Sequence, residues 1–98
     1  MSAYAIFDVD IHDPARYQEY MVKVKPALTE AGARYLVRGG QHKVYESDWI
    51  PRRLVIVEFP SQAAMEAFYY GPVYQGLKEI RDASSSARLV GVEGLDQK

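Results

Sequence analysis

Hydrophobic and polar residues follow two different periods along this chain, and each change of period marks a predicted element. Residues 4–11 alternate with a period of two, which places Ala5, Phe7, Val9 and Ile11 on one face and Tyr4, Ile6, Asp8 and Asp10 on the other. Apolar residues then recur at helical spacing up to Ala31, after an N-cap at Asp13 and a proline at position 14. The pattern therefore predicts a strand followed by a helix.

The same succession occurs in the second half of the chain. Residues 54–59 form a strand-like apolar run that stops at Pro60, and Ser61 is an N-cap for a helix that begins near Gln62 and ends at Gly71. A further helix is predicted over residues 73–82, a polar linker over residues 84–86 and a closing strand over residues 87–93. Residues 95–98 are expected to fray.

The middle of the chain is less regular. Residues 33–38 alternate as a strand that Gly39 and Gly40 end, residues 41–46 are a candidate bulged extension of it, and residues 47–51 form a loop. Within the first helix, Pro26 lacks the N–H that would bond to the carbonyl of Val22, which predicts a kink or a break there.

These elements give a single α+β domain over residues 1–98 in the order βαββαβ, with an antiparallel sheet and helices on one face only. The other face is predicted to carry Tyr4, Ile6, Asp8, Asp10, Arg34, Leu36, Arg38, Leu54, Ile56, Glu58, Leu89 and Glu93. Burying each large aliphatic side chain stabilises a protein by roughly 1.5 to 3 kcal/mol. We therefore expect a homodimer that packs sheet on sheet, with Asp8, Arg38 and Glu58 either paired between the sheets or in solvent at the rim.

The composition narrows the classes of partner. Twelve basic residues against 13 acidic ones give a net charge of -1, which offers no electrostatic footprint for nucleic acid or an anionic membrane. The chain has no cysteine and no run near the roughly 20 apolar residues of a membrane span, so a cytoplasmic protein is expected. His12 and His42 do not form a metal-binding spacing, and no metal or other cofactor is expected.

Several short motifs occur in an order that identifies a family resemblance. They are Arg38-Gly39-Gly40, Asp48-Trp49-x-Pro51, Glu58-Phe59-Pro60-Ser61, Pro72-Val73-Tyr74, Arg81 and Val92-Glu93-Gly94. Across nearly its whole length, the chain resembles the domain-of-unknown-function family 1330. That family is similar to the dimeric α+β barrel superfamily of ferredoxin-like subunits, whose members include cofactor-free monooxygenases, muconolactone isomerases and haem-dependent proteins. The resemblance implies a ferredoxin-like dimer and no particular reaction.

The candidate site is a small, mostly apolar pocket between the sheet and the helices. We expect it to be bordered by Asp8, Arg38, Glu58, Trp49 and Tyr69. Trp49 together with Arg53 is a candidate cover for its mouth, and Tyr74 and Arg81 are further candidates for ligand contact.

Three functions are compatible with such a pocket. The first is a binding protein for a small organic molecule. The second is a cofactor-free monooxygenase-like or isomerase-like enzyme for an enolisable or aromatic substrate, in which Arg38 stabilises an enolate and Asp8 carries the proton. The third is a purely structural dimer module whose cavity is filled by side chains.

Overall fold

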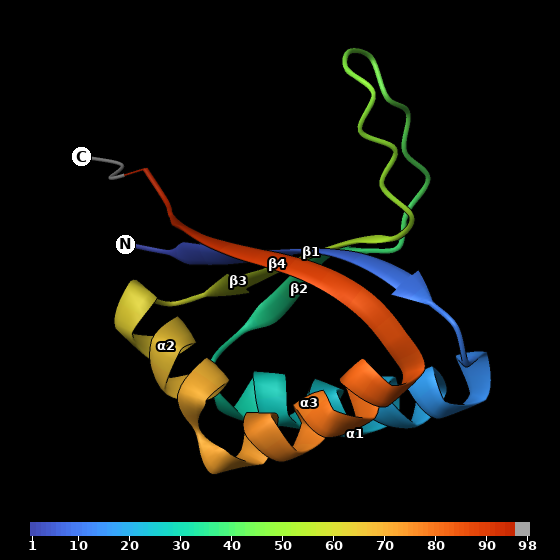
Figure 1. Cartoon of the computed structure of the whole chain (residues 1–98). Helices are drawn as coiled ribbons and strands as arrows, with labels where there is room; N and C mark the ends of the chain where they lie inside the picture. Colours follow the sequence, from blue (N-terminus) through green and yellow to red (C-terminus); the bar gives the residue numbers. More distant parts are fainter. Residues whose placement is uncertain (96–98) are drawn as a thin grey trace.

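The computed structural model describes residues 1–95 and contains four strands and three helices. Their bounds are β1 Ala3–Ile11, α1 Pro14–Glu30, β2 Arg34–Arg38, β3 Leu54–Phe59, α2 Gln62–Tyr70, α3 Pro72–Ser84 and β4 Ser85–Glu93. The strands form one antiparallel sheet in the order β2-β3-β1-β4, and the helices cover one of its faces (Figure 1). The predicted fold class is confirmed. Most of the segment expected to fray, from residue 96 onward, lies outside the described residues.

The helix boundaries follow from local chemistry. The Asp13 carboxylate accepts a hydrogen bond from the Arg16 backbone N–H at 3.2 Å, and the Ser61 hydroxyl accepts one from the Ala64 N–H at 3.0 Å, so both predicted N-caps are present. Gly71 separates α2 from α3. A Cβ at this position would lie 2.8 Å from the carbonyl oxygen of Ala67, so only glycine permits this close approach.

Helix α1 runs through Pro26 without a break, so the predicted break is wrong. Pro26 and Val22 both lie on the exposed side of the helix, where the carbonyl that the proline leaves without a partner is accessible to solvent. The opposite side holds the helix to the sheet through the buried residues Tyr17, Tyr20, Val24 and Leu28. Packing of this side therefore outweighs the local cost of the proline.

A β-bulge changes the faces of strand β2. Tyr35 pairs with Val57, but Val37 pairs with Ile56 and Arg38 with Val55, so the register shifts between Tyr35 and Val37. Directly opposed residues of an antiparallel pair lie on the same face of the sheet. Arg38 therefore shares the helix-covered face with Val55, and the expectation that Arg38 lies on the open face is wrong. Strict alternation fails here because the bulge inserts one extra residue.

The closing strand also differs from its prediction. Ser84 ends α3 and Ser85 begins β4, so there is no polar linker, and the hydroxyls of both serines donate to the Arg81 carbonyl within the chain turn. Leu89 pairs with Phe7 and packs against the core, whereas Val90 pairs with Ile6 and is 58% exposed. The placement of Leu89 on the open face is therefore wrong, and Val90 and Val92 lie there instead.

Residues 39–53 form a long connection between β2 and β3 that we call the arm. It contains no strand, so the candidate extension over residues 41–46 is wrong. The arm rises from the sheet on the side away from the helices (Figure 1). Ser47, at φ 81°, turns the chain within the arm, and Tyr45 and Ile50 are 83% and 74% exposed. Over residues 1–95, no helix combines the length and the apolarity needed to cross a membrane.

Candidate functional site

The candidate site is a pocket of about 370 Å³ between the sheet and the helices. Its floor contains Val57, Ala5 and Gly91, which are paired across β3, β1 and β4. These side chains are small, so they leave room under the helices. The walls are largely aromatic and include Phe7, Tyr17, Tyr20, Tyr35, Phe59, Phe68, Tyr69, Tyr70 and Tyr74. The residues that line the pocket come from every strand and helix of the fold.

Three of the predicted ligand-binding residues line this pocket. Tyr69 and Tyr74 face it from α2 and α3, and Arg38 reaches it because of the bulge in β2. The Arg38 guanidinium lies 5.2 Å from the centre of the Tyr35 ring, within the range of a cation–π contact. The structure therefore brings Arg38, Tyr69 and Tyr74 to one cavity.

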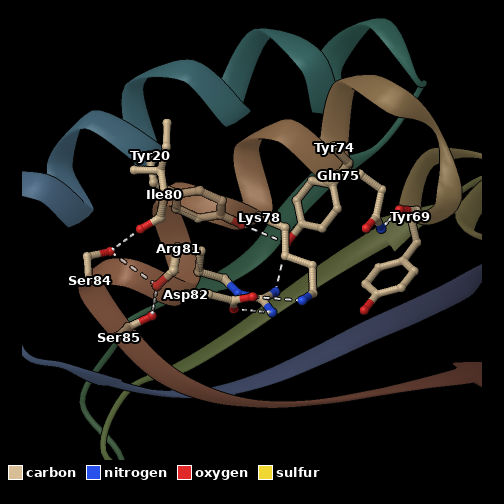
Figure 2. A network of polar contacts seen from close by, with 10 residues as sticks. All are labelled: Tyr20, Tyr69, Tyr74, Gln75, Lys78, Ile80, Arg81, Asp82, Ser84 and Ser85. Atoms are coloured by element: carbon tan, nitrogen blue, oxygen red, sulfur yellow. Dashed lines mark hydrogen bonds and ion pairs between the residues drawn. The ribbon is translucent and has the colours of Figure 1, made fainter.

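Arg81 lies beside the pocket in a buried polar network (Figure 2). It is 5% exposed, and its Nη1 donates to the Tyr74 hydroxyl at 2.8 Å, which in turn lies 2.9 Å from the Tyr20 hydroxyl. Its Nη2 contacts the Asp82 carboxylate at 3.4 Å, and its guanidinium lies over the Phe7 ring. Arg81 thus fixes the phenol of Tyr74 from behind the pocket wall.

Burial controls the protonation of the phenols in this network. It raises the pKa of Tyr20 well above the ordinary value of a tyrosine and also raises the pKa of Tyr74, although the nearby Arg81 opposes both shifts. Burial likewise raises the pKa of Tyr17 and Tyr35. All four side chains therefore remain neutral hydrogen-bonding groups near neutral pH.

Asp8, Trp49 and Glu58 do not border this pocket, so that part of the prediction is wrong. Asp8 and Glu58 have the strand parity of the open face. The Asp8 carboxylate there accepts from the indole N–H of Trp49 at 3.0 Å and from the Arg52 backbone N–H at 2.9 Å. These bonds offset the effect of desolvation and lower the pKa of Asp8. Asp8 and Trp49 therefore fasten the base of the arm.

The Glu58 carboxylate forms an ion pair on the open face. Its carboxylate accepts from Arg34 Nε at 2.7 Å, and this bond lowers the pKa of Glu58. The hydroxyl of Tyr4 donates to the same carboxylate at 3.4 Å. Glu58 therefore pairs with Arg34 and not with Arg38, its expected partner.

The pocket also contains polar residues that the sequence did not indicate as ligand contacts. Arg53 lines it together with Gln62 and Glu66. Arg53 was expected only as part of a cover with Trp49, yet it has the strand parity of Val55 and Val57, so alternation alone could have placed it on the helix-covered face. The helical pattern gave no comparable signal for the buried amide oxygen of Gln62.

The family model described as "Domain of unknown function (DUF1330)" matches residues 2–95. The chain belongs to this family. The resemblance identified from the short motifs is thus confirmed, and the DUF1330 match extends over all four strands and three helices. No curated protein matches the sequence significantly.

Solved structures similar to this DUF1330 chain share its ferredoxin-like fold. A protein of unknown function from Rhodopseudomonas palustris, RPA0582, has a TM-score of 0.76 and 19% identity, over 97% of this chain and 83% of that one. A dimeric ferredoxin-like protein of unknown function from Jannaschia sp. CCS1 has a TM-score of 0.71 and 17% identity, over 96% of this chain and 100% of that one. SnoaB, a cofactor-independent oxygenase from Streptomyces nogalater, has a TM-score of 0.59 and 12% identity, over 98% and 95%. At these identities the likeness shows the fold alone.

Proposed function

We propose that this protein is a homodimer that binds a small, largely apolar organic molecule in the pocket between its sheet and its helices. The pocket itself carries the proposal. Its volume of about 370 Å³ falls within the roughly 300 to 1,000 Å³ typical of sites for small ligands. Its mainly aromatic walls and few polar groups also have the composition of such sites.

The open face of the sheet supports the dimer. Ile56, Ile6 and Val90 form a continuous aliphatic row across three strands, and Leu36 and Val92 beside it are each 47% exposed. Two carboxylates of this face already have partners within the chain, since Glu58 pairs with Arg34 and Asp8 accepts two hydrogen bonds. A second copy can cover these two groups without burying an unpaired charge.

The arm supports the same arrangement. It rises on the side of the sheet that the second copy would cover (Figure 1). Hydrogen bonds to Asp8 hold its base, and the ring of His42 bonds the Pro51 carbonyl at 2.9 Å. Tyr45 and Ile50 remain exposed and offer apolar contacts to the side of a partner subunit. The Jannaschia protein, which is dimeric, provides a precedent in the same fold.

The experiment measures the binding of 2-naphthol, a neutral aromatic probe, by isothermal titration calorimetry. The variant Val24→Phe places a larger side chain in the pocket, because Val24 lines it and is 2% exposed. The control Val22→Phe makes the same change on the exposed side of the same helix, where Val22 is 62% exposed. We expect binding to the wild type and to the control, and at least about tenfold weaker binding to Val24→Phe. Equal binding to all three, or none to the wild type, contradicts the proposed pocket.

A cofactor-free enzyme is the second candidate function. The cationic groups of Arg38 and Arg53 at the pocket support it, since they are suited to stabilise an enolate. Asp8 cannot carry the proton, because it lies on the opposite face of the sheet, and Glu66 is the carboxylate that lines the pocket in residues 1–95. Turnover of enolisable or quinol-type compounds that Arg38→Gln abolishes would favour an enzyme. Ligand retention without turnover, seen by native mass spectrometry, would favour the binding protein.

A further inference from the structure

We propose that the pocket selects an elongated, largely apolar acid that also carries a hydrogen-bond donor at the end opposite its acidic group. The inference rests on the proposed binding function and adds the chemistry of the ligand. It follows from the opposite polarity of the two ends of the pocket.

One end of the pocket is cationic. Arg38 at the end of β2 and Arg53 just before β3 both line it, and neither forms an ion pair with a carboxylate among residues 1–95. The Arg53 Nε atom is buried and has no hydrogen-bond partner within this part of the chain, and its Nη2 donates to the weakly accepting Met21 sulfur at 3.7 Å. Arg53 is half-buried, and a partly desolvated guanidinium gains from an anionic partner, so this end favours a carboxylate or a similar acid.

The position of Arg53 is set by the backbone. Gly39 has a φ of +73°, and a Cβ at this residue would collide with the Arg53 guanidinium. The Gly39 N–H donates to the Leu54 carbonyl at 2.8 Å, and the Arg53 carbonyl accepts from the Val9 N–H at 2.9 Å. The backbone at Arg53 and Leu54 is therefore held from both sides, and the guanidinium lies across a glycine, which pre-organises it for an acidic group.

The other end of the pocket accepts hydrogen bonds. Gln62 at the start of α2 lines it, and its Oε1 atom is buried without a hydrogen-bond partner in residues 1–95. Glu66 follows at i+4 on the same side of the helix and also lines the pocket. An amide oxygen beside a carboxylate favours a hydroxyl or N–H donor and disfavours a second acid.

The two ends are separated by strand β3. Arg53 precedes this strand of six residues and Gln62 follows it, so their backbones are roughly 20 Å apart, and both long side chains shorten the gap. Aromatic and aliphatic side chains line the space between them. A rigid molecule with polar groups at both ends of an apolar body matches this arrangement.

The test compares four related probes by isothermal titration calorimetry at neutral pH. They are 6-hydroxy-2-naphthoate, which has both groups, 6-methoxy-2-naphthoate, which lacks the donor, 2-naphthol, which lacks the acid, and 2-naphthoate, which has the acid alone. We expect the hydroxy acid to bind about tenfold or more tightly than 2-naphthol, because hydrogen bonds to charged groups are the stronger ones. It should also bind about threefold more tightly than either naphthoate that lacks the donor.

Variants assign each preference to one end. Arg53→Gln should reduce the ratio of affinities for the hydroxy acid and 2-naphthol to less than about threefold. The control Arg52→Gln makes the same change of charge at an exposed neighbour and should leave this ratio unchanged. Arg38→Gln, at an exposed position, repeats the test without disturbing a buried group. Gln62→Leu should abolish the preference for hydroxy over methoxy, and the exposed control Gln18→Leu should not.

The outcomes separate the two proposals. If 2-naphthol and the hydroxy acid bind with equal affinity and Val24→Phe weakens both, the proposed ligand class is wrong, but the proposal that the pocket binds small molecules stands. A preference for acids that Arg52→Gln weakens as much as Arg53→Gln and Arg38→Gln do reflects net charge alone and also overturns the ligand class. Failure of every probe to bind the wild type overturns both.

Discussion

The two faces of the sheet differ in the size of their central side chains, although the same three strands supply both. Toward the helices, the row Val57, Ala5 and Gly91 is small, and a pocket lies above it. Toward the open side, the neighbouring row Ile56, Ile6 and Val90 is large and presents a continuous aliphatic surface. One face is therefore built to enclose a molecule, and the other to be covered by a surface.

The two faces also differ in whether their polar groups have hydrogen-bond partners within the chain. On the open face, Glu58 and Asp8 have partners from their own chain. On the helix-covered face, buried atoms of Arg53 and Gln62 have none within residues 1–95. Satisfied charges suit a surface that a second protein covers, whereas unsatisfied groups in a cavity suit a ligand that arrives with its own polar groups.

The largest expected effect concerns the aliphatic row. Ile6→Glu places a carboxylate in the middle of the open face, and in a two-fold dimer each substitution acts twice. Loss of about 1.5 to 3 kcal/mol of burial per copy, with an added charge to desolvate, should weaken the dimer at least about a hundredfold. Sedimentation velocity across a concentration series measures this. The control Val73→Glu, at a 64% exposed position of α3, should leave the dimer intact. A wild type that sediments as a monomer at micromolar concentration contradicts the proposal that a second copy covers the open face.

A substitution of Arg81 tests the stability of the core on the helix-covered face of the sheet. Arg81→Ala removes the hydrogen bond to Tyr74, the contact with Asp82 and the packing over Phe7. We expect a loss of about 2 to 4 kcal/mol in the free energy of unfolding, measured by urea denaturation. Arg16→Ala, at an exposed position of α1, should cost less than about 0.5 kcal/mol. Similar values for the two variants would show that the network does not stabilise the helix-covered face.

Alkaline pH should weaken the same core. The folded protein holds the pKa of Tyr20 and Tyr74 above the unfolded value of 10.0, so their contribution to stability is complete below pH 10 and is lost as the pH rises further. Each such phenol should lower the unfolding free energy by up to about 1.4 kcal/mol per pH unit above that value. Urea titrations at increasing pH should show a shallower decline for Tyr20→Phe than for wild type. Identical slopes would contradict the burial of this phenol.

Sequence patterns predicted the helices and strands well, but they predicted only in part on which face of the sheet each residue lies. Alternation placed Val55 and Val57 correctly because β3 is regular, and the caps Asp13 and Ser61 follow from side-chain chemistry alone. Arg38 was placed on the wrong face because a bulge depends on the pairing of two strands, which one strand's sequence does not record. Leu89 was placed on the wrong face because alternation divides β4 into two sets without saying which one faces the helices, and only its pairing with Phe7 of β1 decides this.

The candidate site was harder to predict than the fold. Arg38, Tyr69 and Tyr74 line the pocket, but Asp8 and Glu58 do not. Their charge suggested chemistry, whereas their hydrogen-bond partners lie 24 or more positions away along the chain, in β2 or in the arm. Such long-range partners appear only once the strands are paired.

The smallest expected effect concerns two adjacent glycines where β2 leaves the sheet. Gly39 has a positive φ, and a Cβ there would meet the Arg53 guanidinium, whereas Gly40 has open space around it and no positive φ. Gly39→Ala should therefore cost about 1 kcal/mol or more in unfolding free energy, and Gly40→Ala should be nearly neutral.

Thermal and urea denaturation measure the difference between these two variants, and the titration with 6-hydroxy-2-naphthoate adds a second comparison. Because Gly39→Ala must displace Arg53, it should also weaken binding of the acid more than binding of 2-naphthol, and Gly40→Ala should change neither. If both variants behave alike in stability and in binding, Arg53 is not held over Gly39. The cationic end of the pocket would then lack the rigidity that distinguishes it from the charged groups of the open face.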